Sequence, residues 1–295
     1  MKLGLAGIGR MGAAMAQRLL GVGHELTVWN RTPEKCAPLA ALGAKVARTP
    51  RELAGAADLV LTILTNAEAI DATYAGADGL LAGDVTGKLF VEMSTVRPQT
   101  QQALATQVQA RGAALIDCPV GGTVGPALNG KLLGFVGGDA ADVARARPVL
   151  EQLCRRVEHV GAIGAGARLK LAINLPLLVY WQALGESLAL CQSLDVDPER
   201  LMDIIADTSG GTNVLKVRGA VIAQALKGTP LDAVTFDVDS MRKDLATMLE
   251  ETRALGREAP VTERALRCYD ALSAAGQGAM DGAMVPVRWA KQGKA

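Results

Sequence analysis

The sequence predicts an α/β fold in two parts, an N-terminal doubly wound parallel sheet with helices on both faces and an all-α C-terminal domain. Short apolar runs alternate with helical segments through the first half of the 295 residues. After Gly161 almost no strand-like run follows, and the glycine-rich stretch at 161–166 marks the change. We therefore place the boundary near residue 163, which gives domains of residues 1–163 and 164–295.

The individual elements follow from short apolar runs and from the helical stretches between them. The first strand is expected over residues 2–6, before a helix over residues 13–20. The further predicted strands are residues 26–29, 59–64, 89–92, 114–117, 132–136 and 157–160, and the clearest helices between them are residues 98–111 and 139–153.

A long helix is predicted to join the two domains. It begins near Gly166 and could run to about Ser193, before Asp197-Pro198 starts the next helix. Pro176 falls inside it, where the proline ring removes a hydrogen bond and is expected to kink the helix.

A glycine loop between the first strand and the first helix predicts a dinucleotide site, formed by Gly7, Ile8, Gly9, Arg10, Met11 and Gly12. Gly7 permits a tight turn, Gly9 lets a pyrophosphate approach the backbone, and Gly12 lets the helix pack on the sheet. The N-terminus of the helix would offer N–H groups and a positive dipole end to the phosphates.

The end of the second predicted strand indicates which dinucleotide is bound. An acidic residue there would accept hydrogen bonds from a ribose and repel a 2′-phosphate, but this chain has Asn30-Arg31-Thr32. An arginine can fork onto a phosphate, so we predict NADP(H) over NAD(H). The alternative is that Arg31 is a solvated loop residue.

Composition limits which kinds of molecule the protein is expected to bind. The formal net charge is +1 with no basic run, so nucleic acid is not favoured. Two histidines and five dispersed cysteines predict free thiols and no metal site. The longest apolar stretch, residues 171–184, contains polar residues and is interpreted as a buried helix, not a membrane span. The N-terminus enters a strand directly, so we expect no signal peptide and a cytoplasmic protein.

Lys170 and Asn174 are four residues apart and therefore share one face of the long helix. Their neighbours are apolar, and burying an ammonium group without a purpose is costly. A lysine beside a bound carbonyl could donate a proton as hydride arrives at carbon. The alternative is a surface lysine whose amine reaches water.

Five ordered segments resemble the β-hydroxyacid dehydrogenase family, which includes 3-hydroxyisobutyrate dehydrogenase and several semialdehyde reductases. They are residues 7–12, 93–96, 117–123 and 164–174, and Phe236 with Lys243-Asp244-Leu245. The resemblance implies a Rossmann domain joined by a long helix to a helical domain, assembled as a homodimer or homotetramer.

The resemblance also implies roles for particular residues. Lys170 would be the general acid, and Asn174 would hold substrate and orient the lysine. The glycine loop and Asn30 to Thr32 would be joined at the cofactor by Leu64, Thr65, Ser94, Thr95, Phe236 and Lys243. Substrate would be bound by Ser94, Pro119, Val120, Gly121, Gly122 and Thr123, with Lys170 and Asn174. Backbone N–H groups of residues 121–123 would receive a carboxylate.

The chain departs from the family pattern in the substrate segment. Gly121 replaces the family serine, and Thr123 replaces the last glycine. Gly122 stands where sulfolactaldehyde reductase has an arginine, which argues against a sulfonate. We predict hydride transfer between NADP(H) and a small 3-hydroxy acid or semialdehyde carboxylate. The alternatives are an imine reductase, against which Lys170 speaks, and a catalytically silent NADP-binding scaffold.

Overall fold

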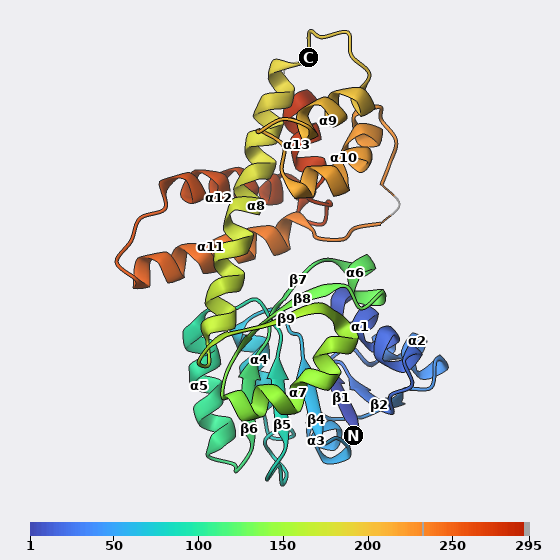
Figure 1. Cartoon of the computed structure of the whole chain (residues 1–295), viewed down its shortest axis with the longest axis vertical. Coiled ribbons are helices and arrows are strands. Elements are labelled where there is room, and N and C mark those ends of the chain that lie inside the picture. Colours follow the sequence, from blue (N-terminus) through green and yellow to red (C-terminus); the bar gives the residue numbers. More distant parts are fainter. Residues whose placement is uncertain (232, 292–295) are drawn as a thin grey trace. The chain divides into compact units, whose positions relative to one another are not determined.

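The computed structural model describes residues 1–231 and 233–291, and the chain divides into two compact units, Met1–Leu171 and Ala172–Ala295 (Figure 1). The division falls inside the long helix α8, Ala165–Leu190. The first unit is an α/β sheet structure and the second is helical, as the sequence predicts.

The first unit contains one sheet with the strand order β3-β2-β1-β4-β5-β6-β8-β7, and β9 pairs with β8. The strands are β1 Leu3–Ala6, β2 Leu26–Trp29, β3 Lys45–Val46, β4 Leu59–Thr62, β5 Leu89–Glu92, β6 Ala114–Asp117, β7 Val120–Gly121, β8 Leu132–Gly137 and β9 Cys154–Gly161. Strands β1 to β6 are parallel and stand in the order β3-β2-β1-β4-β5-β6. The direction of winding reverses between β1 and β4, as in a doubly wound sheet.

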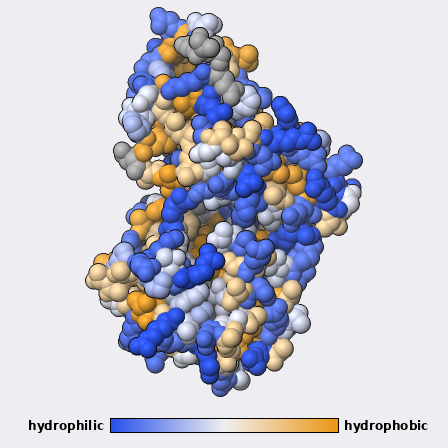
Figure 2. Space-filling model, turned by 180° about the vertical axis from the view of Figure 1, so that it is seen from behind, coloured by the Kyte–Doolittle hydropathy of each residue, from blue (hydrophilic) through white to orange (hydrophobic). Residues whose placement is uncertain are grey.

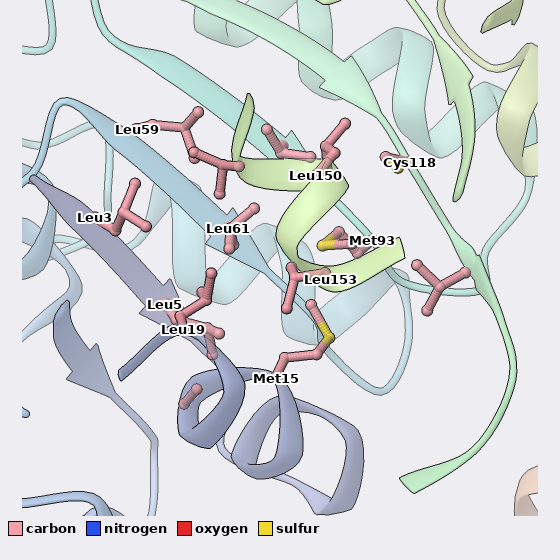
Figure 3. Packing of buried hydrophobic residues seen from close by; sticks show 14 of the residues in the cluster. Leu3, Leu5, Met15, Leu19, Leu59, Leu61, Met93, Cys118, Leu150 and Leu153 are labelled. Atoms are coloured by element: carbon pink, nitrogen blue, oxygen red, sulfur yellow. The ribbon is translucent and has the colours of Figure 1, made fainter. Parts of the chain in front are cut away.

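Helices cover both faces of this sheet. They are α1 Arg10–Gly21, α2 Ala37–Ala41, α3 Pro50–Ala56, α4 Ala67–Ala75, α5 Pro98–Gln109, α6 Val124–Leu128 and α7 Ala140–Leu153, with a 3₁₀ turn at Pro33–Cys36. One apolar layer joins the strands to α1 and α7, and in it Met15 of α1 lies close to Leu153 of α7 (Figure 3). A second layer packs α3, α4 and α5 on the opposite face.

The expectation of a parallel sheet is wrong at one edge, because β8 runs antiparallel to β6 and β7. Parallel neighbours need a crossover of a dozen or more residues that spans the sheet. The chain between β7 and β8 contains only the five-residue helix α6, so it turns back on itself. The 14-residue helix α7 then provides a full crossover, and β9 is parallel to β8.

The second unit consists of helices. After α8 come α9 Pro198–Ala206, α10 Asn213–Leu226, α11 Val238–Ala254, α12 Pro260–Leu272 and α13 Met284–Lys291, with a π-helical turn at Ser273–Gln277. Helix α8 continues through Pro176 and ends at Leu190, slightly before the expected Ser193. Helix α9 begins at Pro198 as expected, and the Asp197 side chain accepts a hydrogen bond from the Glu199 N–H.

The surface drawn in Figure 2 is largely hydrophilic, with hydrophobic residues in separated patches. Within the described residues, none of the helices combines the length and apolarity needed to cross a lipid bilayer. The cysteines are free thiols, of which Cys36, Cys118 and Cys154 are buried in the first unit. Gly134 separates two of them, since a Cβ there would lie 3.2 Å from the Cys118 sulfur and 3.3 Å from the Cys154 sulfur.

Candidate active site

The predicted site segments of the first unit follow the carboxyl ends of neighbouring parallel strands. The glycine loop follows β1, Asn30 follows β2, Leu64 and Thr65 follow β4, Ser94 and Thr95 follow β5, and residues 118–123 follow β6. Parallel strands end at one edge of the sheet, so these segments lie along one edge. Ligands of open α/β sheets bind at this edge, where the winding direction reverses.

The glycines of the loop after β1 have two different reasons to be glycine. Gly7 has a φ of +98°, and a Cβ there would lie 2.1 Å from the Ile63 carbonyl oxygen. A Cβ on Gly12 would lie 1.9 Å from the Gly7 carbonyl oxygen. A Cβ on Gly9, however, would have no described atom within 4 Å. The fold requires Gly7 and Gly12, whereas Gly9 leaves open backbone that a ligand can approach.

Gly9 is also the N-cap of α1, and it has no side chain to occupy the positive end of the helix. The first turn of α1 contains no acidic residue. Open backbone at a helix N-terminus suits a pyrophosphate, which binds to N–H groups and to the helix dipole. These residues therefore fit a dinucleotide.

Asn30 fixes the shape of this loop. Its Oδ1 accepts a hydrogen bond from the Ile8 N–H at 3.0 Å, and its Nδ2 donates to the Thr32 carbonyl at 2.9 Å. The amide thus ties the end of β2 to the glycine loop. Arg31, between Asn30 and Thr32, is the exposed cation at this strand end.

Ser94 connects the two predicted cofactor segments after β4 and β5. Its hydroxyl accepts a hydrogen bond from the Leu64 N–H at 2.7 Å and donates to the Glu92 carboxylate. The Ser94 N–H also donates to Glu92, at 3.1 and 3.2 Å. Ser94 is buried, and through its hydrogen bond with Leu64 it holds these two loops together. Thr65, the residue after Leu64, is exposed. The predicted strand 59–64 stops at Thr62 because Leu64 turns toward Ser94.

Glu92 is the buried centre of this region, and the sequence alone indicated no role for it. The Gln101 amide nitrogen donates to Glu92, and the Thr62 hydroxyl, 2.9 Å from the Tyr74 hydroxyl, donates at 3.4 Å. Burial raises the pKa of Glu92 to about 7, although hydrogen bonds from Ser94 and Gln101 oppose the rise. The available sequence signal was a carboxylate ending an otherwise apolar strand.

Asp117 ends β6 and lies in register with Glu92 on β5. Its Oδ1 accepts a hydrogen bond from the Gly164 N–H at 2.6 Å, and its Oδ2 accepts one from the Ala167 N–H at 2.7 Å. Burial raises the pKa of Asp117 to about 6, against the effect of these hydrogen bonds. Asp117 therefore holds the start of α8.

The predicted substrate segment forms β7 and the turn into α6. Gly122 has a φ of +125°, and a Cβ there would lie 2.8 Å from the Leu132 side chain. An arginine at this position is therefore disfavoured by the backbone itself. A Cβ on Gly121 would lie 3.4 Å from the Phe135 ring, an ordinary contact, so packing does not demand this glycine. Thr123 is the N-cap of α6.

Lys170 and Asn174 both lie on α8, and both are buried, with 8% and 6% of their surfaces exposed. Lys170 is thus not a solvated surface residue. Its position is one turn beyond Ala167, whose N–H is held by Asp117.

In the helical unit, Asp244 of α11 holds two predicted site residues. Its Oδ2 accepts a hydrogen bond from the Asn174 Nδ2 at 3.2 Å, and its Oδ1 pairs with the Lys243 ammonium at 2.6 Å. Asp244 is itself buried. Asp244 belongs to one of the segments that resemble the family, but the sequence alone indicated no role for it.

Phe236 lies in the segment before α11, which is held by Asp281. The Asp281 carboxylate accepts hydrogen bonds from the Thr235 N–H at 2.7 Å and from the Arg218 guanidinium at 2.6 Å. The Phe236 carbonyl accepts a hydrogen bond from the Gly282 N–H at 2.9 Å. These contacts order the segment that leads into Lys243.

Known proteins resemble the chain over nearly its whole length. The family model for the NAD-binding domain of 6-phosphogluconate dehydrogenase matches residues 2–161. The model for the NAD-binding region of NADP-dependent 3-hydroxyisobutyrate dehydrogenase matches residues 164–287. A 3-hydroxyisobutyrate dehydrogenase from Pseudomonas aeruginosa is 34% identical over 258 residues, covering 86% of each chain.

Solved structures agree. A Mycobacterium tuberculosis 3-hydroxyisobutyrate dehydrogenase with L-serine has a TM-score of 0.84 at 30% identity and covers 97% of each chain. A reductive aminase from Aspergillus terreus covers 96% of this chain and 97% of its own, with a TM-score of 0.65 at 24% identity, which shows a shared fold only.

The Rossmann sheet, its glycine loop and these matches define a pyridine-nucleotide-dependent oxidoreductase. The chain belongs to the β-hydroxyacid dehydrogenase family, which confirms the resemblance drawn from its motifs.

Proposed function

We propose that this protein transfers hydride between NADP(H) and a small 3-hydroxy acid or the corresponding semialdehyde carboxylate, with Lys170 as the general acid and base. The observation that carries the proposal is a buried lysine on a helix whose first turn is anchored to the predicted substrate strand. The nicotinamide supplies or accepts the hydride, and the protein must supply the proton.

Lys170 would donate its proton to the carbonyl oxygen during reduction and recover it from the hydroxyl during oxidation. Its ammonium would also stabilise the negative charge that develops on that oxygen. Asn174 would bind substrate through its amide, which Asp244 holds in place. Backbone N–H groups of Gly121, Gly122 and Thr123 would receive the substrate carboxylate.

The cofactor would bind along the glycine loop, with its pyrophosphate at Gly9 and the N-terminus of α1. Arg31 is exposed beside Asn30, whose side chain is already engaged with Ile8. A 2′-phosphate would therefore meet a guanidinium and no carboxylate at this strand end. A solved relative of 29% identity contains NADP+, in line with this choice.

We propose further that the chain assembles as a homodimer or homotetramer, which light scattering would determine.

The test of the mechanism is Lys170→Ala. We expect the variant to bind NADPH as the wild type does and to lose about 10²–10³ in kcat, the usual cost of removing such a donor. NADPH oxidation is followed with succinic semialdehyde, glyoxylate, tartronate semialdehyde, methylmalonate semialdehyde and a cyclic imine. Turnover by Lys170→Ala equal to that of the wild type would disprove the mechanism, and activity confined to the imine would point to an imine reductase.

The test of cofactor choice is Arg31→Ala. The 2′-phosphate would lose its guanidinium partner, so NADPH should bind at least about tenfold more weakly while NADH changes little. Cofactor titration by nicotinamide fluorescence measures both constants. Equal weakening for the two cofactors would contradict the assignment of Arg31.

A further inference from the structure

Helix α8 begins without a capping side chain of its own. The first intrahelical hydrogen bond runs from the Arg168 N–H to the Gly164 carbonyl, so Gly164 is the N-cap residue. Glycine has no side chain with which to satisfy the free N–H groups of the first turn. The required acceptor comes from Asp117, which is 47 residues earlier in the chain.

Asp117 supplies both halves of a capping box from a single side chain. In a capping box, the N–H of the N-cap residue and the N–H three residues later are each bound by a side chain from the other position. Here one carboxylate oxygen receives the Gly164 N–H and the other receives the Ala167 N–H. The negative charge also lies at the positive end of the helix dipole.

Glycines pack against this carboxylate, and a larger residue at their positions would collide with it. A Cβ on Gly137 would lie 2.4 Å from the Asp117 Oδ1, and a Cβ on Gly166 would lie 2.8 Å from its Oδ2. Gly164 itself has a φ of +90°. Three glycines from two parts of the chain thus allow strand β6 and the start of α8 to meet at one buried side chain.

We propose that Asp117 is a positioning residue, which fixes Lys170 relative to the substrate segment by fastening the first turn of α8 to the end of β6. This inference rests on the proposed function of Lys170. Asp117 is followed directly by Cys118 and Pro119, so the same residue starts the predicted substrate segment. Lys170 lies three residues beyond Ala167, a rise of about 4.5 Å along the helix.

The placement matters because proton transfer depends strongly on geometry. A displacement of about 1 Å at a reacting group can cost about 10² in rate. Loosening the first turn of α8 would allow such a displacement of Lys170. The glycine loop predicted to bind the cofactor lies between β1 and α1, away from β6, and would keep its structure.

The test compares Asp117→Asn with Asp139→Asn. The Asp117 amide has nearly the size of the carboxylate, but its NH₂ group would face a backbone N–H, so one hydrogen bond is lost and two donors oppose each other. Asp139 caps α7 through a hydrogen bond from the Ala141 N–H at 2.8 Å, and it is exposed and is not one of the predicted site residues. It therefore controls for loss of an aspartate cap. All measurements are made well below the unfolding midpoint of each variant.

Four quantities are measured: kcat, the NADPH dissociation constant, the primary isotope effect with deuterated NADPH, and hydrogen exchange at the amides of α8. For Asp117→Asn we expect kcat to fall at least about tenfold, with NADPH binding within about twofold of the wild type. The isotope effect should rise, because chemistry becomes slower than product release. The Gly164 and Ala167 amides should exchange faster. Asp139→Asn should change none of these quantities.

Two results would overturn the inference. If Asp117→Asn exchanges faster at α8 but keeps the wild-type kcat and isotope effect, Asp117 only stabilises the fold. If exchange at Gly164 and Ala167 is unchanged, Asp117 does not fasten the helix. Should Asp117→Asn fail to fold, Asp117→Ser, which retains an acceptor, is measured in the same way. An active Lys170→Ala would instead overturn the proposed function, without affecting the exchange result.

Discussion

Replacing Glu92 by glutamine should remove a large pH dependence from the stability of this protein. Glu92 is fully buried, and burial raises its pKa from the usual 4.5 to about 7. Between these values the folded protein holds a proton that the unfolded chain releases. The free energy of unfolding therefore falls as pH rises from about 4.5 to about 7.

The size of this effect follows from the two pKa values. One pH unit of difference corresponds to about 1.4 kcal/mol, so Glu92 alone accounts for a loss of about 3 kcal/mol across this range. Burial also raises the pKa of Asp117, from its usual 3.8 to about 6. The free energy of unfolding therefore falls further as pH rises between these two values. Glutamine has the size of the protonated acid, and its NH₂ group can donate to the Gln101 Oε1 once the Gln101 amide, whose nitrogen now faces Glu92, turns over. This Oε1 is buried and has no hydrogen-bond partner among the described residues.

The assay is urea unfolding, followed by circular dichroism at pH 5, 6, 7 and 8. Glu92→Gln should be close to the wild type at pH 5 and should exceed it by about 2–3 kcal/mol at pH 8, because only the wild type must then bury a charge. The exposed carboxyl of Glu151 gives the control, Glu151→Gln. If the Glu92→Gln profile keeps the wild-type slope between pH 5 and 7, Glu92 does not carry the proton and the reasoning fails.

Further predictions concern the glycine loop and the helical unit. Gly9→Ala should keep the wild-type melting temperature, since a Cβ there meets no described atom, but should bind NADPH at least about tenfold more weakly, as a titration would show. Gly7→Ala should cost about 3 kcal/mol or more in urea unfolding, because its positive φ and the nearby Ile63 carbonyl leave no room for a Cβ. Asp281→Ala should cost about 2–4 kcal/mol by the same method, since it leaves the Arg218 guanidinium and the Thr235 N–H without their acceptor. A wild-type free energy of unfolding in Gly7→Ala or Asp281→Ala, or wild-type NADPH binding in Gly9→Ala, would contradict these accounts.

The sequence predicted those parts of the fold that local patterns determine. Strands β2, β5 and β6 have the predicted bounds, because each is a short, mainly apolar run that the local sequence itself marks. The two-residue strands β3 and β7 were not predicted, since they are strands only through pairing with a neighbour. The reversal of β8 likewise depends on a short connection whose path no local pattern specifies.

In the candidate site, too, the sequence predicted the residues that a local pattern marks and missed the contacts between distant segments. The glycine loop and the pair Lys170 and Asn174 were recognisable from spacing. The partners that hold them were not, because each contact joins distant segments: Asn30 to Ile8, Asp117 to Gly164, and Asp244 to Asn174. A buried carboxylate has no local signature, since the polar groups that satisfy it are brought by the fold.

The distribution of cysteines has a practical consequence. Burial raises the pKa of the Cys118 thiol well above its usual range and that of Cys154 to about 12, so neither forms the reactive thiolate in the folded state. Both belong to the first unit, whereas the more accessible Cys191 and Cys268 belong to the second. The rate of alkylation at each cysteine, followed by mass spectrometry, would therefore report the opening of the sheet unit separately from that of the helices. The native cysteines suffice for this measurement, so none has to be engineered.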